Sequence, residues 1–407
     1  MMISVHKDNL TALIDGVAAH GGSEEGVTRL SFTPEYRAAA NWLKAYMADI
    51  GLSVREDGVG TIFGRLEGTD PAAAAVMSGS HLDSVRQGGK YDGIAGIVCA
   101  VEAVRAIRAS GLAHTRPIEV VVMNEEEGCR FSDGMISSRA MLGKFTELDL
   151  AQRDTDGITM RQAMADYGAS GDYRTCVRDD LAAFVELHIE QGPVLEANGC
   201  DIGIVSSIVA LQGFELTIRG LAGHAGTTPM RGRRDPMVAL GAIIARATQE
   251  TEALGGGEVL TFGQVGTLPG SPNVIPFAAR STVDARADRM DKVEHILALL
   301  RAACDEICAQ NGTIYELKPL YRKENVSLDQ GIRAMLARYA EQAGFCSMSL
   351  PSGAGHDSQI MAERVPTAMI FIPNTDGRSH CKEEHASPER LYKGAHVLAQ
   401  TLYELAK

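Results

Sequence analysis

The first third of the chain alternates between short apolar runs and longer segments with helical periodicity. An apolar run at 73–77 and a segment at 118–123 that is apolar except for one glutamate predict buried strands. The segment 94–110 between them, apolar on most faces, predicts a largely buried helix. An apolar stripe with helical spacing predicts an amphipathic helix over 34–50, which Thr33 can cap. Strand, helix and strand in this order are typical of a mostly parallel sheet.

A different order of elements begins near Gly203. Predicted strands and helices now follow as strand, helix, strand, strand, helix, strand, which is the order of a split β-α-β, ferredoxin-like unit. The strands are expected at 214–219, 259–265, 278–286 and 313–320, and the helices at 235–251 and 292–310.

The last part of the chain returns to the first pattern. A helix is expected over 330–343, a flexible glycine-rich loop at 352–357 and a strand at 367–372. We therefore predict an α/β protein in which an inserted α+β domain interrupts a domain with a mostly parallel sheet. The expected boundaries are 1–207 for the first part of the main domain, 208–325 for the insertion and 326–407 for the second part.

Composition and charge narrow the classes of function. The chain has 407 residues, of which 45% are hydrophobic, so a globular protein with two domains is expected. Its formal net charge of −13 argues against nucleic acid and anionic membrane surfaces as partners. The same charge implies that an anionic substrate needs a local basic residue.

The apolar runs and the cysteines indicate a cellular location. No run reaches transmembrane length, and the first residues lack the apolar stretch of a signal peptide. The eight cysteines are scattered without a C-x-x-C pair, which favours reduced thiols in a cytoplasmic protein.

Polar residues with metal-binding side chains follow the strand predicted at 73–77. His81 and Asp92 stand beyond its carboxyl end, which is where open α/β sheets bind ligands. Asp83 leaves an extended segment on the same side as His81, and it suits a carboxylate that accepts the second imidazole N–H. Alone, His-x-Asp is common and favours a polar loop with a chance histidine and aspartate, so the assignment to a metal site depends on the rest of the chain.

Three consecutive glutamates, Glu125, Glu126 and Glu127, follow the strand predicted at 118–123. A carboxylate cluster repels itself unless cations neutralise it, and bulky apolar residues flank this run. A metal site is therefore favoured over a solvated acidic turn.

Two later segments add histidines. Glu186 and His188 lie on one face of a predicted strand, and beside His81 and Asp92 the second of them is a candidate third ligand. After the strand at 367–372, His380 and His385 compete as a further ligand, and His380 follows the strand more closely.

Together these side chains are sufficient for two metal ions that share a carboxylate. Such a centre needs about five protein ligands and open positions for water. Asp92 would bridge the ions, and a glutamate outside the ligand set can carry a proton from water to a leaving amine. His224, between glycines on the insertion, can donate a hydrogen bond to a developing oxyanion. The candidates for the metal centre are His81, Asp92, Glu126, Glu127, His188 and His380.

Seven motifs then occur in a characteristic order. They are Gly-Ser-His-Leu-Asp-Ser-Val, Gly-Gly-Lys-Tyr-Asp-Gly, Asn-Glu-Glu-Glu-Gly-Cys-Arg-Phe, Leu-His-Ile-Glu-Gln-Gly-Pro, Gly-His-Ala-Gly-Thr-Thr-Pro-Met, Ser-Gly-Ala-Gly-His-Asp and Ser-His-x-x-x-Glu. With these motifs, which span nearly the whole chain, the protein resembles the hydantoinase/carbamoylase group of dinuclear amidohydrolases. That group includes N-carbamoyl-L-amino acid hydrolase, allantoate amidohydrolase and β-ureidopropionase, and it is related to the aminoacylase and carboxypeptidase-type metallopeptidases.

The resemblance implies roles for the motif residues. It implies an α/β catalytic domain and a smaller inserted domain that mediates homodimerisation. Glu126 becomes the general base and Glu125 the spare carboxylate. The implied metal ligands are His81, Asp92, Glu127, His188 and His380.

Further residues match substrate-binding positions of the family. His224 matches an oxyanion histidine that the partner subunit usually supplies, so the active sites of a homodimer would be shared. Gln191, Asn273 and Arg286 match substrate-binding positions, with Arg286 taking the substrate carboxylate. A guanidinium fork suits that task, and it supplies the local cation that this acidic chain needs.

The implied activity is hydrolysis of a carbamoyl or ureido C–N bond on a small carboxylate, which converts an N-carbamoyl-L-amino acid to the L-amino acid, CO2 and NH3. Allantoate is the alternative substrate, and N-acyl-amino acids or dipeptides are a further class, because a two-metal centre is indifferent to the group it attacks. A non-catalytic relative would lack the base or a ligand, and none is missing. The ligands suit two divalent ions per subunit, zinc or manganese, with cobalt or nickel as further options.

Two departures from the family pattern concern the substrate. Leu211 stands where allantoate-specific relatives tend to place a glutamine, and the loop before His380 reads Asp-Gly-Arg-Ser in place of Gly-Ile-Ser. Neither departure alters the metal-binding residues.

Overall fold

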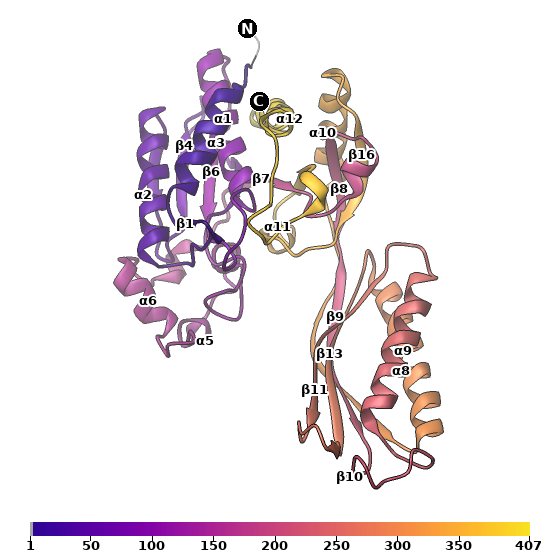
Figure 1. Ribbon diagram of the computed structural model, residues 1–407. Coiled ribbons are helices and arrows are strands. Elements are labelled where there is room, and N and C mark those ends of the chain that lie inside the picture. The colour runs from indigo at the N-terminus through magenta and orange to yellow at the C-terminus, as the bar shows by residue number, and fades with distance from the viewer. Residues whose placement is uncertain (1–2) are drawn as a thin grey trace. The chain divides into compact units, whose positions relative to one another are not determined.

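The structure, a computed structural model, describes residues 3–407 and divides into two compact units (Figure 1). The first unit contains the chain up to Ser206 together with Ser327–Leu350 and Gly355–Lys407. The second contains Ser207–Val326 and Pro351–Ala354. Each unit buries its own cluster of apolar side chains.

A nine-stranded sheet forms the centre of the first unit. In the order β15, β8, β17, β7, β5, β6, β4, β3, the middle strands β17, β7, β5 and β6 are parallel, and β16 pairs with β8. This confirms the predicted mostly parallel sheet. The strands are β3 (Ser53–Glu56), β4 (Ile62–Leu66), β5 (Ala75–His81), β6 (Ile118–Met123), β7 (Leu181–Ile189), β8 (Ile202–Ile208), β15 (Val326–Ser327), β16 (Ser347–Ser352) and β17 (Thr367–Ile372).

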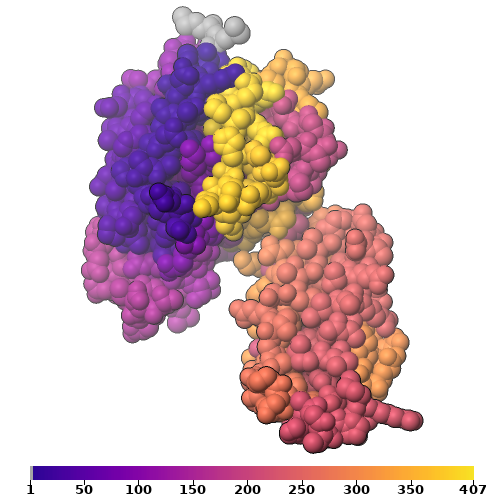
Figure 2. Space-filling model, viewed as in Figure 1, coloured from indigo at the N-terminus to yellow at the C-terminus, as the bar shows by residue number. Residues whose placement is uncertain are grey.

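Alternating residues of the central strands face two separate apolar layers. Val76 and Val122 belong to the larger core under the long helices, whereas Met77 and Val121 belong to a smaller cluster on the other side. Helices α1 and α12, from opposite ends of the chain, lie side by side over the larger core (Figure 2). The helices of the unit are α1 (Lys7–Ala18), α2 (Pro34–Asp49), α3 (Ile94–Ser110), α4 (Ile136–Met141), α5 (Glu147–Leu150), α6 (Met160–Tyr167), α7 (Val194–Ala197), α10 (Gln330–Gln342), α11 (Asp357–Met361) and α12 (Pro388–Ala406), with the 3-10 turns η1 (Tyr173–Cys176) and η2 (Thr375–Gly377) and the short pair β1 (Gly22–Ser23) and β2 (Gly26–Val27).

Several predicted elements agree with the structure and others need correction. Helix α3 and strand β6 have the predicted bounds, and Thr33 caps α2 by accepting the Tyr36 N–H. Strand β5 is longer than predicted, because it pairs with β6 as far as His81. The segment predicted as a flexible loop at 352–357 ends in buried residues, His356 and Asp357, and α11 starts there.

The second unit is an antiparallel sheet with two long helices. The order β11, β13, β9, β14 is that of the split β-α-β unit predicted from the sequence, and α8 and α9 cover one face (Figure 1). A small pair, β10 and β12, lies off this sheet. The elements are β9 (Ala210–Arg219), β10 (Gly223–His224), α8 (Pro236–Glu252), β11 (Val259–Leu268), β12 (Val274–Ile275), β13 (Ala278–Ala287), α9 (Met290–Asn311) and β14 (Ile314–Lys323).

Candidate metal centre

The parallel strands bring the candidate ligands to one edge of the first unit's sheet. His81 is the last residue of β5, His188 is the next-to-last residue of β7, and the acidic run begins just after β6. The loop that follows β17 carries His380. Because the carboxyl ends of parallel strands meet at the same edge, residues far apart in sequence become neighbours there.

Asp92 lies at the centre of the cluster. Its Oδ1 atom is 3.1 Å from His188 Nε2 and 3.8 Å from His81 Nε2. Its Oδ2 atom is 3.0 Å from His380 Nε2, which in turn is 3.6 Å from Glu127 Oε1. One carboxylate therefore contributes an oxygen to each of two groups that could hold a metal, His81–Asp92–His188 and Asp92–Glu127–His380.

The hydrogen bonds of the two buried histidines define their tautomers. His81 Nδ1 lies 3.0 Å from the Asp83 carbonyl oxygen, and His188 Nδ1 lies 2.9 Å from that of Ile189. A carbonyl oxygen only accepts, so each Nδ1 carries the proton and each Nε2 presents a lone pair. The Gly93 N–H, which donates to His188 Nε2 at 3.3 Å, agrees with this assignment.

The Nε2 lone pairs of His81 and His188 face an oxygen of Asp92, which is itself a hydrogen-bond acceptor. Asp92 Oδ1 is buried and has no hydrogen-bond partner among the described residues, although His188 Nε2 lies close to it. Acceptors that converge in a buried site need a cation between them, and imidazole nitrogen with carboxylate oxygen is a donor set for divalent transition metals. The residues therefore fit a metal centre.

The protonation of the cluster also reflects an excess of negative charge. Burial, with the nearby charge of Asp92, raises the pKa of Glu127 to about 8, and burial with Glu127 raises the pKa of Glu126 well above its usual value. Burial lowers the pKa of His81 to about 4, so its imidazole is neutral at pH 7. The Asp92 carboxylate, through its contacts with both rings, raises the pKa of His188 and of His380 to about 9. Protons thus collect on carboxylates and on histidines around Asp92, which is the behaviour of a site that cations stabilise.

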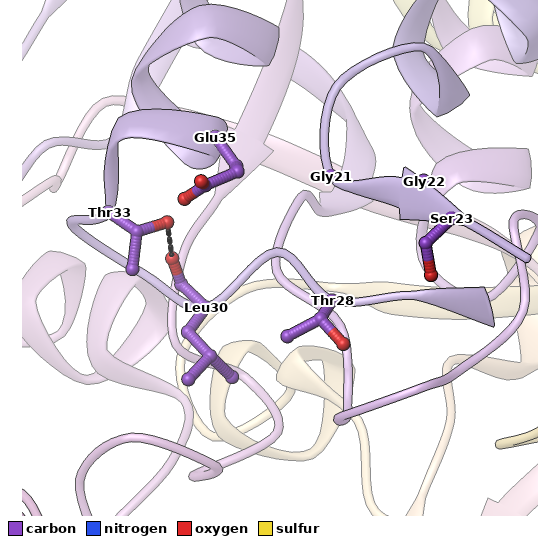
Figure 3. Close-up of a pocket in the computed structure, with 7 residues that line it drawn as sticks. All are labelled: Gly21, Gly22, Ser23, Thr28, Leu30, Thr33 and Glu35. Carbon is purple, nitrogen blue, oxygen red and sulfur yellow. Dashed lines mark hydrogen bonds between the residues drawn. The ribbon is translucent and has the colours of Figure 1, made fainter. Parts of the chain in front are cut away.

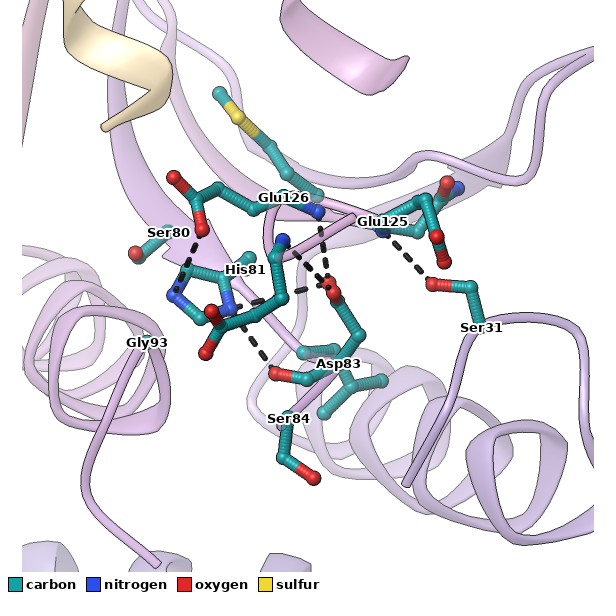
Figure 4. Close-up of polar contacts among 12 residues, drawn as sticks. Ser31, Ser80, His81, Asp83, Ser84, Gly93, Glu125 and Glu126 are labelled. Atoms are coloured by element: carbon teal, nitrogen blue, oxygen red, sulfur yellow. Dashed lines mark hydrogen bonds and ion pairs between the residues drawn. The ribbon is translucent and has the colours of Figure 1, made fainter. Parts of the chain in front are cut away.

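The carboxylate of Asp83 supports the acidic run rather than the histidine. It was expected to accept the second imidazole N–H of His81, but the main-chain carbonyl of Asp83 does so, and the nearest carboxylate oxygen is 3.8 Å away. Its two oxygens instead accept the backbone N–H groups of Glu126 and Glu127, each at 3.2 Å (Figure 4). Strand β5 extends through His81 and leaves the Asp83 side chain turned toward that loop.

Glu125 is held away from the cluster. Its backbone N–H donates to Ser31 Oγ at 2.8 Å (Figure 4), and its carboxylate accepts the N–H groups of Phe131 at 2.6 Å and Arg130 at 3.1 Å. The side chain therefore stabilises the loop after β6.

Sequence reasoning assigned no role to Glu384, the last residue of the Ser-His-x-x-x-Glu motif. Its Oε1 accepts the backbone N–H groups of Tyr91 at 2.8 Å and Asp92 at 3.0 Å, and its Oε2 accepts the Ser379 hydroxyl at 2.7 Å. This one buried carboxylate thus joins the loop that carries Asp92 to the loop that carries His380. In the sequence, only its place in the Ser-His-x-x-x-Glu motif indicated a role for Glu384.

A second group that the sequence did not reveal is centred on Glu186 in β7. Glu186 is fully buried and accepts the hydroxyls of Ser80 at 2.7 Å and Ser358 at 2.6 Å. The ring of His356 packs edge-on against that of His188, with centroids 4.6 Å apart. Glu186 was on the same strand face as His188 in sequence, but nothing there indicated its serine partners.

His385 and Gln191 also have defined partners. His385, the competitor of His380, is exposed, and its Nδ1 is 3.1 Å from the Tyr91 hydroxyl. Gln191 places its amide nitrogen 3.1 Å from Asp92 Oδ2 and 3.5 Å from His380 Nε2. The cluster thus includes Gln191 and His380.

The remaining predicted substrate residues belong to the second unit. His224 pairs with Val274 across β10 and β12, which makes Asn273 its near neighbour. His224 Nδ1 accepts the backbone N–H groups of Gly226 at 3.1 Å and Thr227 at 3.2 Å, so its proton is on Nε2. The exposed ring can therefore donate from Nε2.

Arg286 is held in a fixed orientation on β13. Its Nε donates to Asp284 Oδ1 at 2.7 Å and its Nη1 to the Gly353 carbonyl at 3.1 Å. Tyr321 donates to the other oxygen of Asp284 at 2.7 Å. A guanidinium held in this way loses little conformational entropy on binding an anion.

A separate hollow of about 510 Å³ lies in the first unit (Figure 3). Glycines, a serine and two threonines contribute most of its lining, and Glu35 is its only charged residue. It contains none of the candidate ligands, so the chemistry of this protein is expected at the edge of the sheet.

A family profile, curated relatives and solved structures match this chain. The sequence profile of Peptidase family M20/M25/M40 matches residues 77–404. The N-carbamoyl-L-amino-acid amidohydrolase of Paenarthrobacter aurescens is 38% identical over 93% of this chain and 93% of its own, and the allantoate amidohydrolase of Bacillus subtilis is 37% identical over 98% of each. A crystal structure of a hydantoinase/carbamoylase family amidase from Burkholderia multivorans superposes with a TM-score of 0.92 at 34% identity, covering 99% of this chain and 98% of that one. Over the described residues, the helices are all too short or too polar to span a membrane.

Proposed function

The chain belongs to Peptidase family M20/M25/M40, and on that premise we propose that it is a metal-dependent amidohydrolase acting on N-carbamoyl-L-amino acids. The reaction cleaves the carbamoyl C–N bond and yields the L-amino acid, CO2 and NH3. The observation that carries the proposal is the shared position of Asp92 between two groups of potential metal ligands. Relatives that act on N-carbamoyl-L-amino acids and on allantoate match along nearly the whole chain.

Two divalent ions fit the two groups. His81, Asp92 and His188 would hold one ion, and Asp92, Glu127 and His380 the other, with zinc or manganese as the expected metals and cobalt or nickel as alternatives. When bound, such ions act as Lewis acids that polarise the scissile carbonyl and increase the acidity of water. Glu384 fixes the backbone of Asp92 and the hydroxyl of Ser379, so both groups keep their spacing.

Glu126 is the proposed proton carrier. It is outside both Asp92 groups, although with His81 and Glu127 it forms a third group of potential ligands. Its Oε2 lies 3.9 Å from His81 Nε2, and Asp83 fixes its backbone. A carboxylate in this position can take a proton from the attacking water and deliver it to the leaving nitrogen.

The second unit supplies three of the proposed substrate contacts, and Gln191 of the first unit supplies the fourth. His224 Nε2–H donates to the oxygen that becomes negative during attack, and Arg286 binds the substrate carboxylate, with Asn273 and Gln191 as further polar contacts. We propose a homodimer in which each protomer lends His224 to its partner. The chain would act in the cytoplasm.

An ammonia-release screen tests the substrate. Purified protein loaded with zinc or manganese is assayed on N-carbamoyl-L-amino acids, their D enantiomers, allantoate, β-ureidopropionate and, by amine release, N-acyl-amino acids. The Glu126→Gln variant with its metal content measured serves as the control. Turnover of allantoate alone would move the assignment to the second relative's activity, and turnover of acyl-amino acids alone would place the protein with the peptidases of its family.

A further inference from the structure

Two cysteines from distant parts of the chain meet in the first unit. Cys200 lies between α7 and β8, and Cys346 lies directly before β16. Their sulfur atoms are 2.9 Å apart although 146 positions separate them in sequence. Neither cysteine is among the residues of the metal cluster.

The backbone holds the two cysteines together independently of their side chains. The Cys346 carbonyl accepts the N–H groups of Asp201 at 2.9 Å and Ile202 at 3.1 Å. In return, the Cys346 N–H donates to Asp201 Oδ2 at 3.2 Å. Lys393 forms an ion pair with Asp201, with its Nζ 2.6 Å from Asp201 Oδ1. The approach of the sulfurs is therefore a property of the fold.

The two thiols differ in accessibility. Cys346 is exposed, whereas Cys200 is buried. The hydrogen bond with Cys346, followed by burial, raises the pKa of Cys200 to about 11, so Cys200 stays a thiol at neutral pH. Cys346 is consequently the sulfur that a soluble oxidant reaches first.

We propose that Cys200 and Cys346 form a reversible disulfide, a redox modification site apart from the metal centre. Hydrogen peroxide oxidises the Cys346 thiol to a sulfenic acid and releases one water. The Cys200 sulfur then attacks the Cys346 sulfur, the S–O bond breaks, and a second water leaves with the Cys200 proton. Two thiols thus lose two electrons and two protons while one peroxide becomes two waters, and a dithiol reductant reverses the reaction.

The position of this bond determines its effect. The segment from Cys200 to Cys346 contains the whole of Ser207–Val326, so the disulfide closes a covalent loop around the chain of the second unit. A cross-link over so long a loop stabilises mainly by restricting the unfolded chain. For a protein of this size we expect the Tm to rise by about 5 °C on oxidation.

The test measures thiols, linked peptides and Tm before and after one equivalent of peroxide, and again after dithiothreitol. We expect the wild-type protein to lose two of its eight thiols, to yield a Cys200–Cys346 linked peptide, and to gain about 5 °C in Tm that the reductant removes. The Tm of Cys200→Ser and of Cys346→Ser should not rise on oxidation. The control Cys381→Ser, at a partly exposed cysteine, should show the same rise in Tm as the wild type.

Each variant is compared with itself before oxidation, so a change in its basal stability does not affect the result. Absence of the linked peptide at full peroxide consumption would overturn the proposal. So would an equal rise in Tm in Cys346→Ser, or oxidation of Cys346 only to a sulfinic acid or to a bond between two chains.

Discussion

Replacing Glu384 by alanine should weaken metal binding although none of the proposed metal ligands is replaced. The substitution removes the acceptor of two backbone N–H groups and one hydroxyl, at 2.8, 3.0 and 2.7 Å. Hydrogen bonds to a charged acceptor contribute about 1.5–3 kcal/mol each, and water entering the vacated space recovers part of that sum. We therefore expect the free energy of unfolding of the metal-free protein to fall by about 4 kcal/mol, and metal affinity to fall by about 10- to 100-fold.

Two control variants separate this effect from a general loss of charge. Glu383 is the neighbouring residue, but it pairs with Arg378 at the surface, where both side chains are nearly half exposed, so Glu383→Ala should cost less than about 1 kcal/mol. Glu384→Gln keeps a carbonyl oxygen where Oε1 accepts both backbone N–H groups, so it should lose about 1–2 kcal/mol.

Urea unfolding of the metal-free protein measures the change in the free energy of unfolding. The only tryptophan, Trp42, lies on α2 in the same unit and reports its unfolding by fluorescence. Competition with a chelating indicator measures metal affinity. If Glu384→Ala and Glu383→Ala shared one urea midpoint and one metal affinity, the hydrogen bonds of Glu384 would not support the centre, and this reasoning would be refuted.

Three further predictions concern the proposed reaction. Glu126→Gln should keep its metal and lose at least about 100-fold in kcat, whereas Glu127→Ala should lose metal at one site. The metal content of both variants is measured, and the reverse result would mean that Glu127 is the proton carrier and Glu126 the ligand. Arg286→Lys should lower kcat/KM about 10- to 100-fold for substrates with a carboxylate and much less for their amides. The control Arg280→Lys, on the same strand, should leave kcat/KM unchanged for both kinds of substrate. An equal fall in kcat/KM on acid and amide would mean that Arg286 does not bind the carboxylate. Mixing Glu126→Gln with His224→Ala subunits should restore about a quarter of wild-type activity if each protomer lends His224 to its partner, and no recovery after confirmed exchange would place His224 in its own protomer's site or outside catalysis.

Local signals predicted the long elements well. Helix α3 begins after Gly93 and ends at Gly111, which takes the left-handed conformation with φ of 66°, and the apolar residues between them identify the helix without tertiary information. Strand β6 is likewise apolar at every position except Glu119. The residues within each of these elements are enough to predict it, so no tertiary information was needed.

The errors arise where a distant partner satisfies a polar residue. The end of β5 is rich in serine, glycine and histidine, which is typical of a loop, yet Ser80 is buried because Glu186 accepts its hydroxyl. Glu384 stands 292 positions from Asp92, whose backbone it holds, and no periodicity indicates such a contact. Residue types at the strand ends identified the candidate ligands and motif resemblance implied their roles, while the residues that orient them required the structure.

The connection between the two units has a practical consequence. The chain leaves the first unit after Ser206 and returns at Ser327, and the Leu328 N–H donates to the Ser206 carbonyl at 3.2 Å, so departure and return are adjacent. A tight turn could replace Ser207–Val326 without stretching either strand. Such a miniaturised protein would keep His81, Asp92 and His380 but carry no His224 or Arg286, which would separate the assembly of the metal centre from the recognition of substrate. Apart from the short segment Pro351–Ala354, the second unit is in this sense a removable domain, inserted at one junction of the first unit.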